Sequence, residues 1–203
     1  MMRIRKLSNL SILQVLLILA VASLVTNVFS QAKTIIEIDT TKGVIQLELY
    51  PEKAPKTVEN FLHYVETGYF EQLVFHRVID NWIIQSGGYD ENFMMEDTLL
   101  PIRNEATNGL KNKRGTIAMA RMIDPHSADT QFFINLSDNN NLDHRARTFN
   151  DYGYCVFGKV IEGMDVSDAI GDVETHEIDG YQDVPIQPVF LKSARIISRD
   201  LIK

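Results

Sequence analysis

Short segments that alternate apolar and polar residues constrain the fold of this 203-residue chain more than any other feature. Residues 34–40, TIIEIDT, and 43–50, GVIQLELY, are two such segments, with Thr41-Lys42-Gly43 at their junction. A period of two is the signature of a half-buried β-strand, so the pair predicts a hairpin. Further short apolar segments follow at 73–79, 82–85, 115–120, 131–136, 154–161 and 189–197.

Two segments have helical periodicity instead. In residues 54–68, the apolar residues Val58, Phe61, Leu62 and Val65 fall at i, i+3, i+4 and i+7, which is one face of an amphipathic helix, and Gly68 is a natural stop. Residues 164–170, MDVSDAI, predict a second helix that ends at the following glycine. Many short strands with two helices favour a mainly β fold, a closed antiparallel barrel.

The first 32 residues are set apart by their composition. Arg3, Arg5 and Lys6 begin the segment, residues 7–32 carry no charge, and Ser30-Gln31-Ala32 ends it with small residues at the first and third places. This pattern predicts a secretory signal peptide at 1–32, cleaved after Ala32. The alternative is an uncleaved anchor, because the apolar run approaches the roughly 20 residues that span a bilayer. Either alternative places residues 33–203, a single predicted domain, outside the cytoplasm.

Residues 33–203 are acidic and contain one cysteine. They hold 17 basic and 27 acidic residues, a net charge of −10, which argues against nucleic acid and anionic membranes as partners. One compact acidic domain also favours a monomer. Cys155, the single cysteine, allows no internal disulfide, so the core must hold the domain together. It lies in the apolar run YGYCVFGKV and is predicted to be buried and unreactive.

No pattern for metal, cofactor or nucleophilic chemistry stands out. The five histidines have no metal-ligand spacing, and we expect neither a metal site nor a cofactor. Residues 124–129, DPHSAD, crowd four polar side chains together. A hydrolytic triad converges from separate elements and needs an oxyanion hole, so a polar turn is the better interpretation.

What remains is a set of polar residues embedded in strand-like apolar runs, namely Arg77, Gln85, Arg121 and Gln131. Taken singly, each has an ordinary interpretation: Arg77 could form a salt bridge on an acidic barrel, and Arg121 could be a solvated loop residue. The apolar residues beside them are each more often core than site. Those neighbours include Trp82, Ile83, Met119, Phe133, Leu142 and Tyr154.

Three segments in this order resemble the cyclophilin family of peptidyl-prolyl isomerases. They are FHRVIDNWIIQSGG at 75–88, GTIAMAR followed by DTQFFINL, and NLDH followed by YCVFGKVIEGMDV. The resemblance extends from about Thr34 to Ile197. The stretch NEATNGLKNKRGTIAMAR and the N-terminal signal are most similar to the secreted bacterial branch.

The resemblance implies an eight-stranded closed barrel capped by two helices, with the active groove on its outer face. It implies a prolyl isomerase that acts in the periplasm on proline-containing segments of unfolded or partly folded exported proteins. A non-catalytic proline-binding module or chaperone of the same fold is the alternative. The residues it assigns are Arg77 and Gln85 as catalytic, and Trp82, Ile83, Met119, Ala120, Arg121, Gln131, Phe133, Leu142 and Tyr154 as substrate-binding.

The chain departs from the eukaryotic pattern of that family at several of these positions. Trp82 stands where a phenylalanine is usual, and Ile83 where a methionine is usual. Tyr154 replaces a histidine that lines the pocket, and Arg121 replaces an asparagine. Asn141 occupies the place of a tryptophan that contacts cyclosporin, so we expect weak binding of that drug.

Overall fold

The computed structural model describes residues 33–199. The predicted signal peptide at 1–32 lies outside this range. Within the described range, neither of the two helices is long and apolar enough to cross a bilayer.

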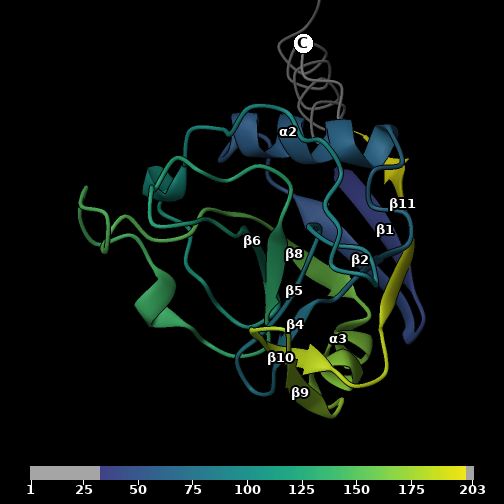
Figure 1. Ribbon diagram of the computed structural model, residues 1–203. Helices are drawn as coiled ribbons and strands as arrows, with labels where there is room; N and C mark the ends of the chain where they lie inside the picture. The colour runs from purple at the N-terminus through teal and green to yellow at the C-terminus, as the bar shows by residue number, and fades with distance from the viewer. Residues whose placement is uncertain (1–32, 200–203) are drawn as a thin grey trace, which may run out of the picture. The chain divides into compact units, whose positions relative to one another are not determined.

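Nine strands form one curled sheet that surrounds the core (Figure 1). The sheet order is β3-β11-β1-β2-β8-β6-β7-β5-β4, and every pairing is antiparallel. Its strands are β1 (Thr34–Thr40), β2 (Gly43–Leu49), β3 (Leu73–Val74), β4 (Arg77–Ile79), β5 (Ile83–Ser86), β6 (Thr116–Met119), β7 (Phe132–Asn135), β8 (Val156–Glu162) and β11 (Phe190–Ser198).

The mainly β architecture with two helices agrees with the sequence-based prediction, but eight strands and full closure are not confirmed. The order ends at β3 and β4, and no hydrogen-bonded ladder joins these two strands within residues 33–199. Residues 73–79, expected as one strand, are divided between β3 and β4 by Phe75 and His76.

A second, two-stranded sheet was not expected from the sequence. It consists of β9 (Thr175–Ile178) and β10 (Tyr181–Pro185), joined by Asp179 and Gly180. Both turn residues have positive φ, 50° and 87°, as a type I′ turn requires. The Asp-Gly pair is a hairpin signal, but the flanking residues are polar and show no apolar alternation, so periodicity alone missed these strands.

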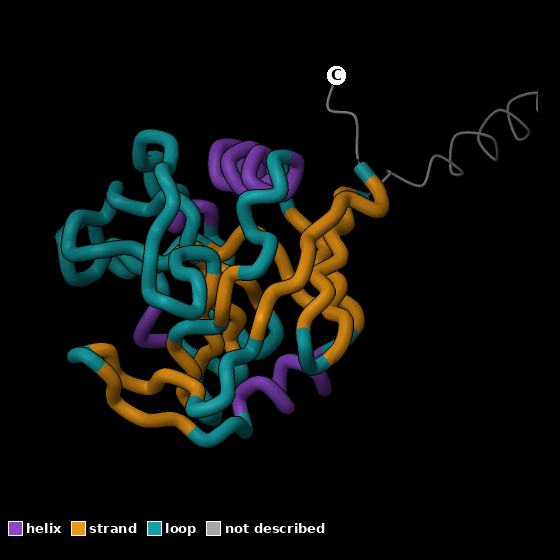
Figure 2. Tube along the Cα trace, turned by 45° about the vertical axis from the view of Figure 1, so that its right-hand side comes forward, coloured by secondary structure: helices purple, strands orange, loops and turns teal. Residues whose placement is uncertain are grey.

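The two helices lie at opposite ends of the curled sheet (Figures 1 and 2). Helix α2 (Pro55–Glu66) buries the four predicted apolar positions, and α3 (Met164–Gly171) ends at the predicted glycine. Short 3₁₀ turns, η1 (Ala106–Asn108) and η2 (Asn140–Leu142), interrupt the long loops. Helix α2 therefore closes one end of the core with an apolar face.

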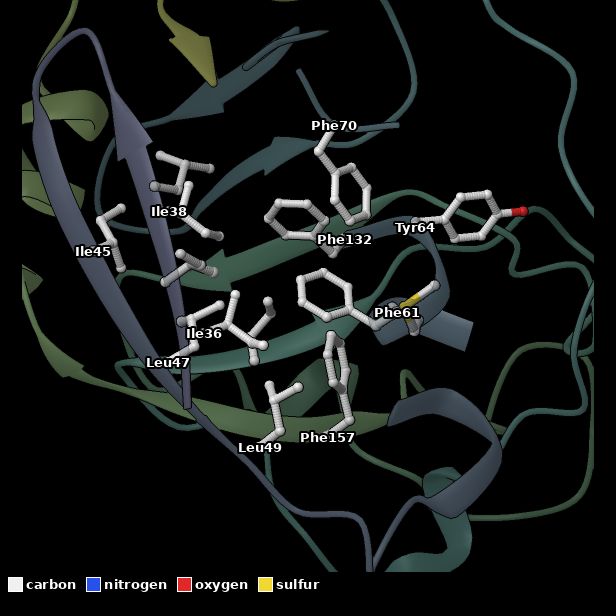
Figure 3. Packing of buried hydrophobic residues seen from close by; sticks show 14 of the residues in the cluster. Ile36, Ile38, Ile45, Leu47, Leu49, Phe61, Tyr64, Phe70, Phe132 and Phe157 are labelled. Carbon is white, nitrogen blue, oxygen red and sulfur yellow. The ribbon is translucent and has the colours of Figure 1, made fainter. Parts of the chain in front are cut away.

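Phe61 of α2 is the centre of the core. Its ring lies 5.2 Å from Phe70, 5.5 Å from Phe132 and 5.2 Å from Phe157 (centroid distances), and the aliphatic side chains of β1 and β2 complete the cluster (Figure 3). Cys155 packs in the same cluster, 2% exposed, and burial raises the pKa of its thiol to about 11. The prediction of a buried, unreactive cysteine is confirmed as to burial, and the high pKa leaves little thiolate at neutral pH.

Candidate active site

A row of paired residues crosses five neighbouring strands. Arg77 of β4 is the partner of Gln85 on β5, and Gln85 is the partner of Phe133 on β7. Phe133 in turn pairs with Ala118 on β6, and Ala118 with Val156 on β8. Directly opposed residues point to the same face of a sheet. The ladder register therefore places the guanidinium, the amide and an apolar surface in one line.

Alternation along the strands separates this row from the core. Ile84 and Phe132 belong to the core cluster, whereas their chain neighbours Ile83 and Phe133 belong to a second cluster on the other face. The second cluster, called the groove cluster below, consists of Ile83, Ala118, Phe133, Leu142 and Val156, with Trp82, Leu110, Ala120 and Tyr154 packed against it.

The groove cluster brings together most of the predicted substrate-binding residues. Ile83, Phe133 and Leu142 are members, and the ring of Tyr154 lies 5.6 Å from that of Phe133 in an edge-on arrangement. Met119 is not among them. Its side chain is 2% exposed and packs in the main core, because it alternates with Ala118 on β6.

The side chain of Arg77 is partly exposed and has one charged partner. Its guanidinium carbon lies 5.2 Å from the centre of the Trp82 ring. Its Nε lies 3.4 Å from Oδ2 of Asp183 on β10, and each of these two side chains is 36% exposed. The two terminal nitrogens of Arg77 have no hydrogen-bond partner among residues 33–199. They are available to a ligand.

Gln85 is held by a second glutamine, Gln131. The Nε2 of Gln85 donates to Oε1 of Gln131 at 3.0 Å. Gly88 makes room for this pair, since a Cβ at that position would come within 2.6 Å of the Gln131 side chain. Gly87 has a φ of 88°, and a Cβ there would lie 2.7 Å from the carbonyl oxygen of Thr130. The glycine pair in the sequence thus serves close packing beside the site.

His76 lies next to Arg77 in the chain and is 6% exposed. Burial lowers the pKa of its imidazole to about 4, and the positive charge of Arg77 acts in the same direction. Its ring stands edge-on to Tyr89, with centroids 4.8 Å apart. His76 is therefore neutral at neutral pH, and Arg77 is left as the positive charge at this position.

Arg121 has a different environment from Arg77. Its Nε donates to the carbonyl of Gly153, and its terminal nitrogens donate to the carbonyls of Met122, Ile123 and Phe149, at 2.9–3.3 Å. Its guanidinium carbon lies 4.7 Å from the centre of the Tyr154 ring. The side chain thus joins the loop after β6 to the loop before β8.

Two contributions to the site were missed from the sequence. Asp183 reaches Arg77 only because the β9–β10 hairpin folds back over β4. Tyr181 on that hairpin packs against Phe93 and Tyr89, with centroid distances of 4.3 and 5.7 Å. The Asp-Gly turn could have predicted the hairpin, but no sequence signal places it beside Arg77.

Residues 124–129 form a polar turn, as predicted. The hydroxyl of Ser127 donates to the carbonyl of Asp124 and accepts from the backbone N–H of Met122. Nδ1 of His126 accepts from the backbone N–H of Asn104, so the serine and histidine make no catalytic pair. Across residues 33–199, no group of three or more His, Cys, Asp or Glu side chains is arranged to hold a metal ion.

Comparisons with known proteins agree with this geometry. The family profile described as cyclophilin type peptidyl-prolyl cis-trans isomerase matches residues 35–196. A peptidyl-prolyl cis-trans isomerase of Streptomyces antibioticus is 53% identical over 162 residues, covering 80% of this chain and 98% of that protein. One from Acinetobacter baylyi is 46% identical over 185 residues, covering 91% of this chain and 97% of that protein.

A solved structure has the same fold. The cyclophilin type peptidyl-prolyl cis-trans isomerase of Cryptosporidium parvum has a TM-score of 0.67 at 25% identity, covering 82% of this chain and 99% of that chain. The profile covers most of the chain, and the relatives match over nearly their full length. This chain belongs to the cyclophilin-type peptidyl-prolyl cis-trans isomerase family.

Proposed function

We propose that this protein accelerates rotation about X-Pro bonds, with Arg77 as the catalytic group and the groove cluster as the proline-binding surface. The observation that carries the proposal is the cross-strand row that joins Arg77, Gln85 and Phe133. It sets a guanidinium with free donors in line with the apolar residues of the groove cluster.

The reaction breaks no bond. Lone-pair donation from nitrogen stiffens the amide and gives a rotation barrier of about 18–20 kcal/mol. The two isomers of an X-Pro bond are close in energy but exchange over tens to hundreds of seconds. A catalyst must bind the twisted amide more tightly than either planar form.

Arg77 can make that distinction. In the twisted amide the prolyl nitrogen is pyramidal, and its lone pair accepts a hydrogen bond that the planar amide does not accept. A guanidinium stays charged at any working pH and presents its donors rigidly. Its terminal nitrogens would donate to the freed lone pair while Nε stays beside Asp183.

One hydrogen bond does not account for the whole acceleration. A charge-assisted bond contributes about 1.5–3 kcal/mol. An acceleration of about 10⁵ requires near 7 kcal/mol, at roughly 1.4 kcal/mol per factor of ten. The rest would come from holding the proline ring against Phe133 and Leu142, and from an apolar wall that lowers the dielectric around the charge.

The cellular setting is the second part of the proposal. The N-terminal sequence supports export, so the substrates would be proline-containing segments of exported proteins during folding in the periplasm. Asn141 is exposed and offers no large aromatic surface, which supports weak cyclosporin binding. Mass spectrometry of the N-terminus of protein from the periplasmic fraction would distinguish a cleaved signal from a retained anchor.

Proline-isomer exchange measured by NMR on a short Ala-Pro peptide tests the function. Wild-type protein at catalytic concentration should raise the exchange rate well above the uncatalysed rate, and Arg77→Ala should remove most of the increase. A wild type that binds the peptide without raising the rate would favour the alternative, a proline-binding module or chaperone. Equal rates for wild type and Arg77→Ala would reject the proposed role of Arg77.

A further inference from the structure

A hollow lies beside the groove cluster. It has a volume of about 520 Å³ and includes Leu142 and Tyr154, which also belong to or pack on that cluster. Ligand pockets in proteins have volumes of about 300–1,000 Å³, so the hollow is large enough for a bulky side chain. Its other apolar lining residues are Met122, Ile123 and Phe149.

These three lining residues are unusually exposed. Met122 is 78% exposed, Ile123 81% and Phe149 63%, and all three border the same hollow although they come from two separate loops. Single exposed apolar residues are ordinary, but a group of three that borders one hollow indicates contact with an apolar ligand.

Arg121 builds this hollow before any ligand arrives. Four of its five N–H donors go to carbonyls of the two loops, those of Gly153, Met122, Ile123 and Phe149. Its flat face covers the ring of Tyr154. These hydrogen bonds hold the two loops together, so ordering the loops would cost little of the binding free energy of a ligand.

We propose that this hollow, the flanking subsite, binds a large apolar side chain of the substrate that lies one or two residues from the proline. The inference rests on the proposed function, because the shared residues Leu142 and Tyr154 connect the two surfaces. An extended peptide advances about 3.3 Å per residue, so only near neighbours of the proline reach the subsite. The enzyme would then prefer X-Pro bonds in apolar segments, which folded proteins bury and unfolded proteins expose.

Peptide series test the proposal. Alanine peptides with one central Ala-Pro would carry a single leucine or phenylalanine at each of the two positions on either side of that dipeptide, and kcat/KM would be measured for each. Wild type should prefer one of these peptides over the all-alanine peptide by about tenfold, as expected for burial of one large apolar side chain. No preference at any of the four positions would overturn the proposal.

Variants locate the preference. The measured quantity is the ratio of kcat/KM for the preferred apolar peptide to kcat/KM for the all-alanine peptide. Phe149→Ser and Ile123→Ser should reduce this ratio to about twofold. Phe149→Leu should retain most of it, because an aliphatic side chain still offers apolar surface. The ratio is internal to each preparation, so a loss of folded enzyme leaves it unchanged. Leu100→Ser is the matched control, because Leu100 is 87% exposed and borders a different hollow beside α2. An undiminished ratio in Phe149→Ser would contradict the subsite.

Two further outcomes are distinguishable. If wild type fails to accelerate exchange even in the all-alanine peptide, the proposed function fails and not only the subsite. If sedimentation shows a dimer in wild type and a monomer in Phe149→Ser, the apolar group is a contact between copies of this chain, and the subsite proposal is wrong.

Discussion

Arg77 and Arg121 lie at two parts of the same site, and each places its guanidinium over an aromatic ring. Arg77 lies 5.2 Å from the ring centre of Trp82, and Arg121 lies 4.7 Å from that of Tyr154. The difference is in their hydrogen bonds. The guanidinium of Arg77 has an ion pair with Asp183 but no hydrogen bond among residues 33–199, whereas that of Arg121 donates to four backbone carbonyls.

This difference supports the proposed catalytic role of Arg77 and indicates a structural role for Arg121. The donors of Arg121 are saturated by its own loops, so little of its hydrogen-bonding capacity is left for substrate. The terminal donors of Arg77 have no hydrogen-bond partner among residues 33–199, and they belong to a strand whose position is fixed by the β4–β5 ladder. Both residues are arginines that lie over an aromatic ring. The number of hydrogen-bond acceptors near each guanidinium is what distinguishes their roles.

The largest expected effect comes from removing the free guanidinium. Arg77→Ala should lower kcat/KM for an Ala-Pro peptide by about 10- to 150-fold, the equivalent of one charge-assisted hydrogen bond. Arg77→Lys should restore part of the loss, because it keeps the charge but not the rigid donors. Arg195→Ala is the matched control, since Arg195 on β11 pairs with Glu37 on β1, far from β4 in the strand order, and the change should leave kcat/KM unchanged. A similar loss in that control would point to a general charge effect.

His76 lies beside Arg77 in its neutral form, and its neutral state predicts that the free energy of unfolding depends on pH. The pKa of His76 is about 4 in the folded protein, against an ordinary value near 6.5. The unfolded chain therefore binds the proton more tightly, and stability present above pH 6.5 is lost as the pH falls towards 4. The loss should reach about 2 kcal/mol between pH 7.5 and pH 5.

Urea unfolding of wild type and His76→Gln across this range measures that contribution. The carboxylates titrate in both proteins, so the difference between their free energies of unfolding isolates the histidine. The difference should shrink as the pH falls, and parallel pH curves would show that His76 is not buried in its neutral form.

Arg121→Ala should affect stability more than chemistry. Loss of four partly exposed hydrogen bonds should lower the free energy of unfolding by about 1–2 kcal/mol. Hydrogen exchange should accelerate in residues 121–123 and 145–153, because the hydrogen bonds of Arg121 join these two loops. The loss of kcat/KM should be smaller than that of Arg77→Ala, and a larger loss would break the distinction between the two arginines.

The smallest effect is expected at Asp183. Partly exposed ion pairs contribute about 0.2–1 kcal/mol, so Asp183→Ala should lower kcat/KM by only about two- to fivefold, through greater mobility of Arg77. Asp183→Asn retains an acceptor for Nε and should lie between wild type and alanine. If both variants match wild type in kcat and KM, Asp183 does not orient the arginine.

The sequence by itself determined most of the strands, both helices and the burial of Cys155, because these depend on local apolar periodicity. It also grouped Ile83, Phe133, Leu142 and Tyr154, through motifs similar to a known family, and the structure places these residues together. Met119 was grouped with them but lies in the core, since its place on β6 gives it the opposite face from Ala118.

Only the tertiary structure decided which groups surround the two arginines. Asp183 lies more than 100 residues after Arg77, and the carbonyls around Arg121 come from loops without periodicity. Contacts of this kind depend on how strands pair and how loops fold back, which no local pattern encodes. The physical reason is that a side chain's own chemistry sets how many donors it has, while distant backbone decides how many of them remain free.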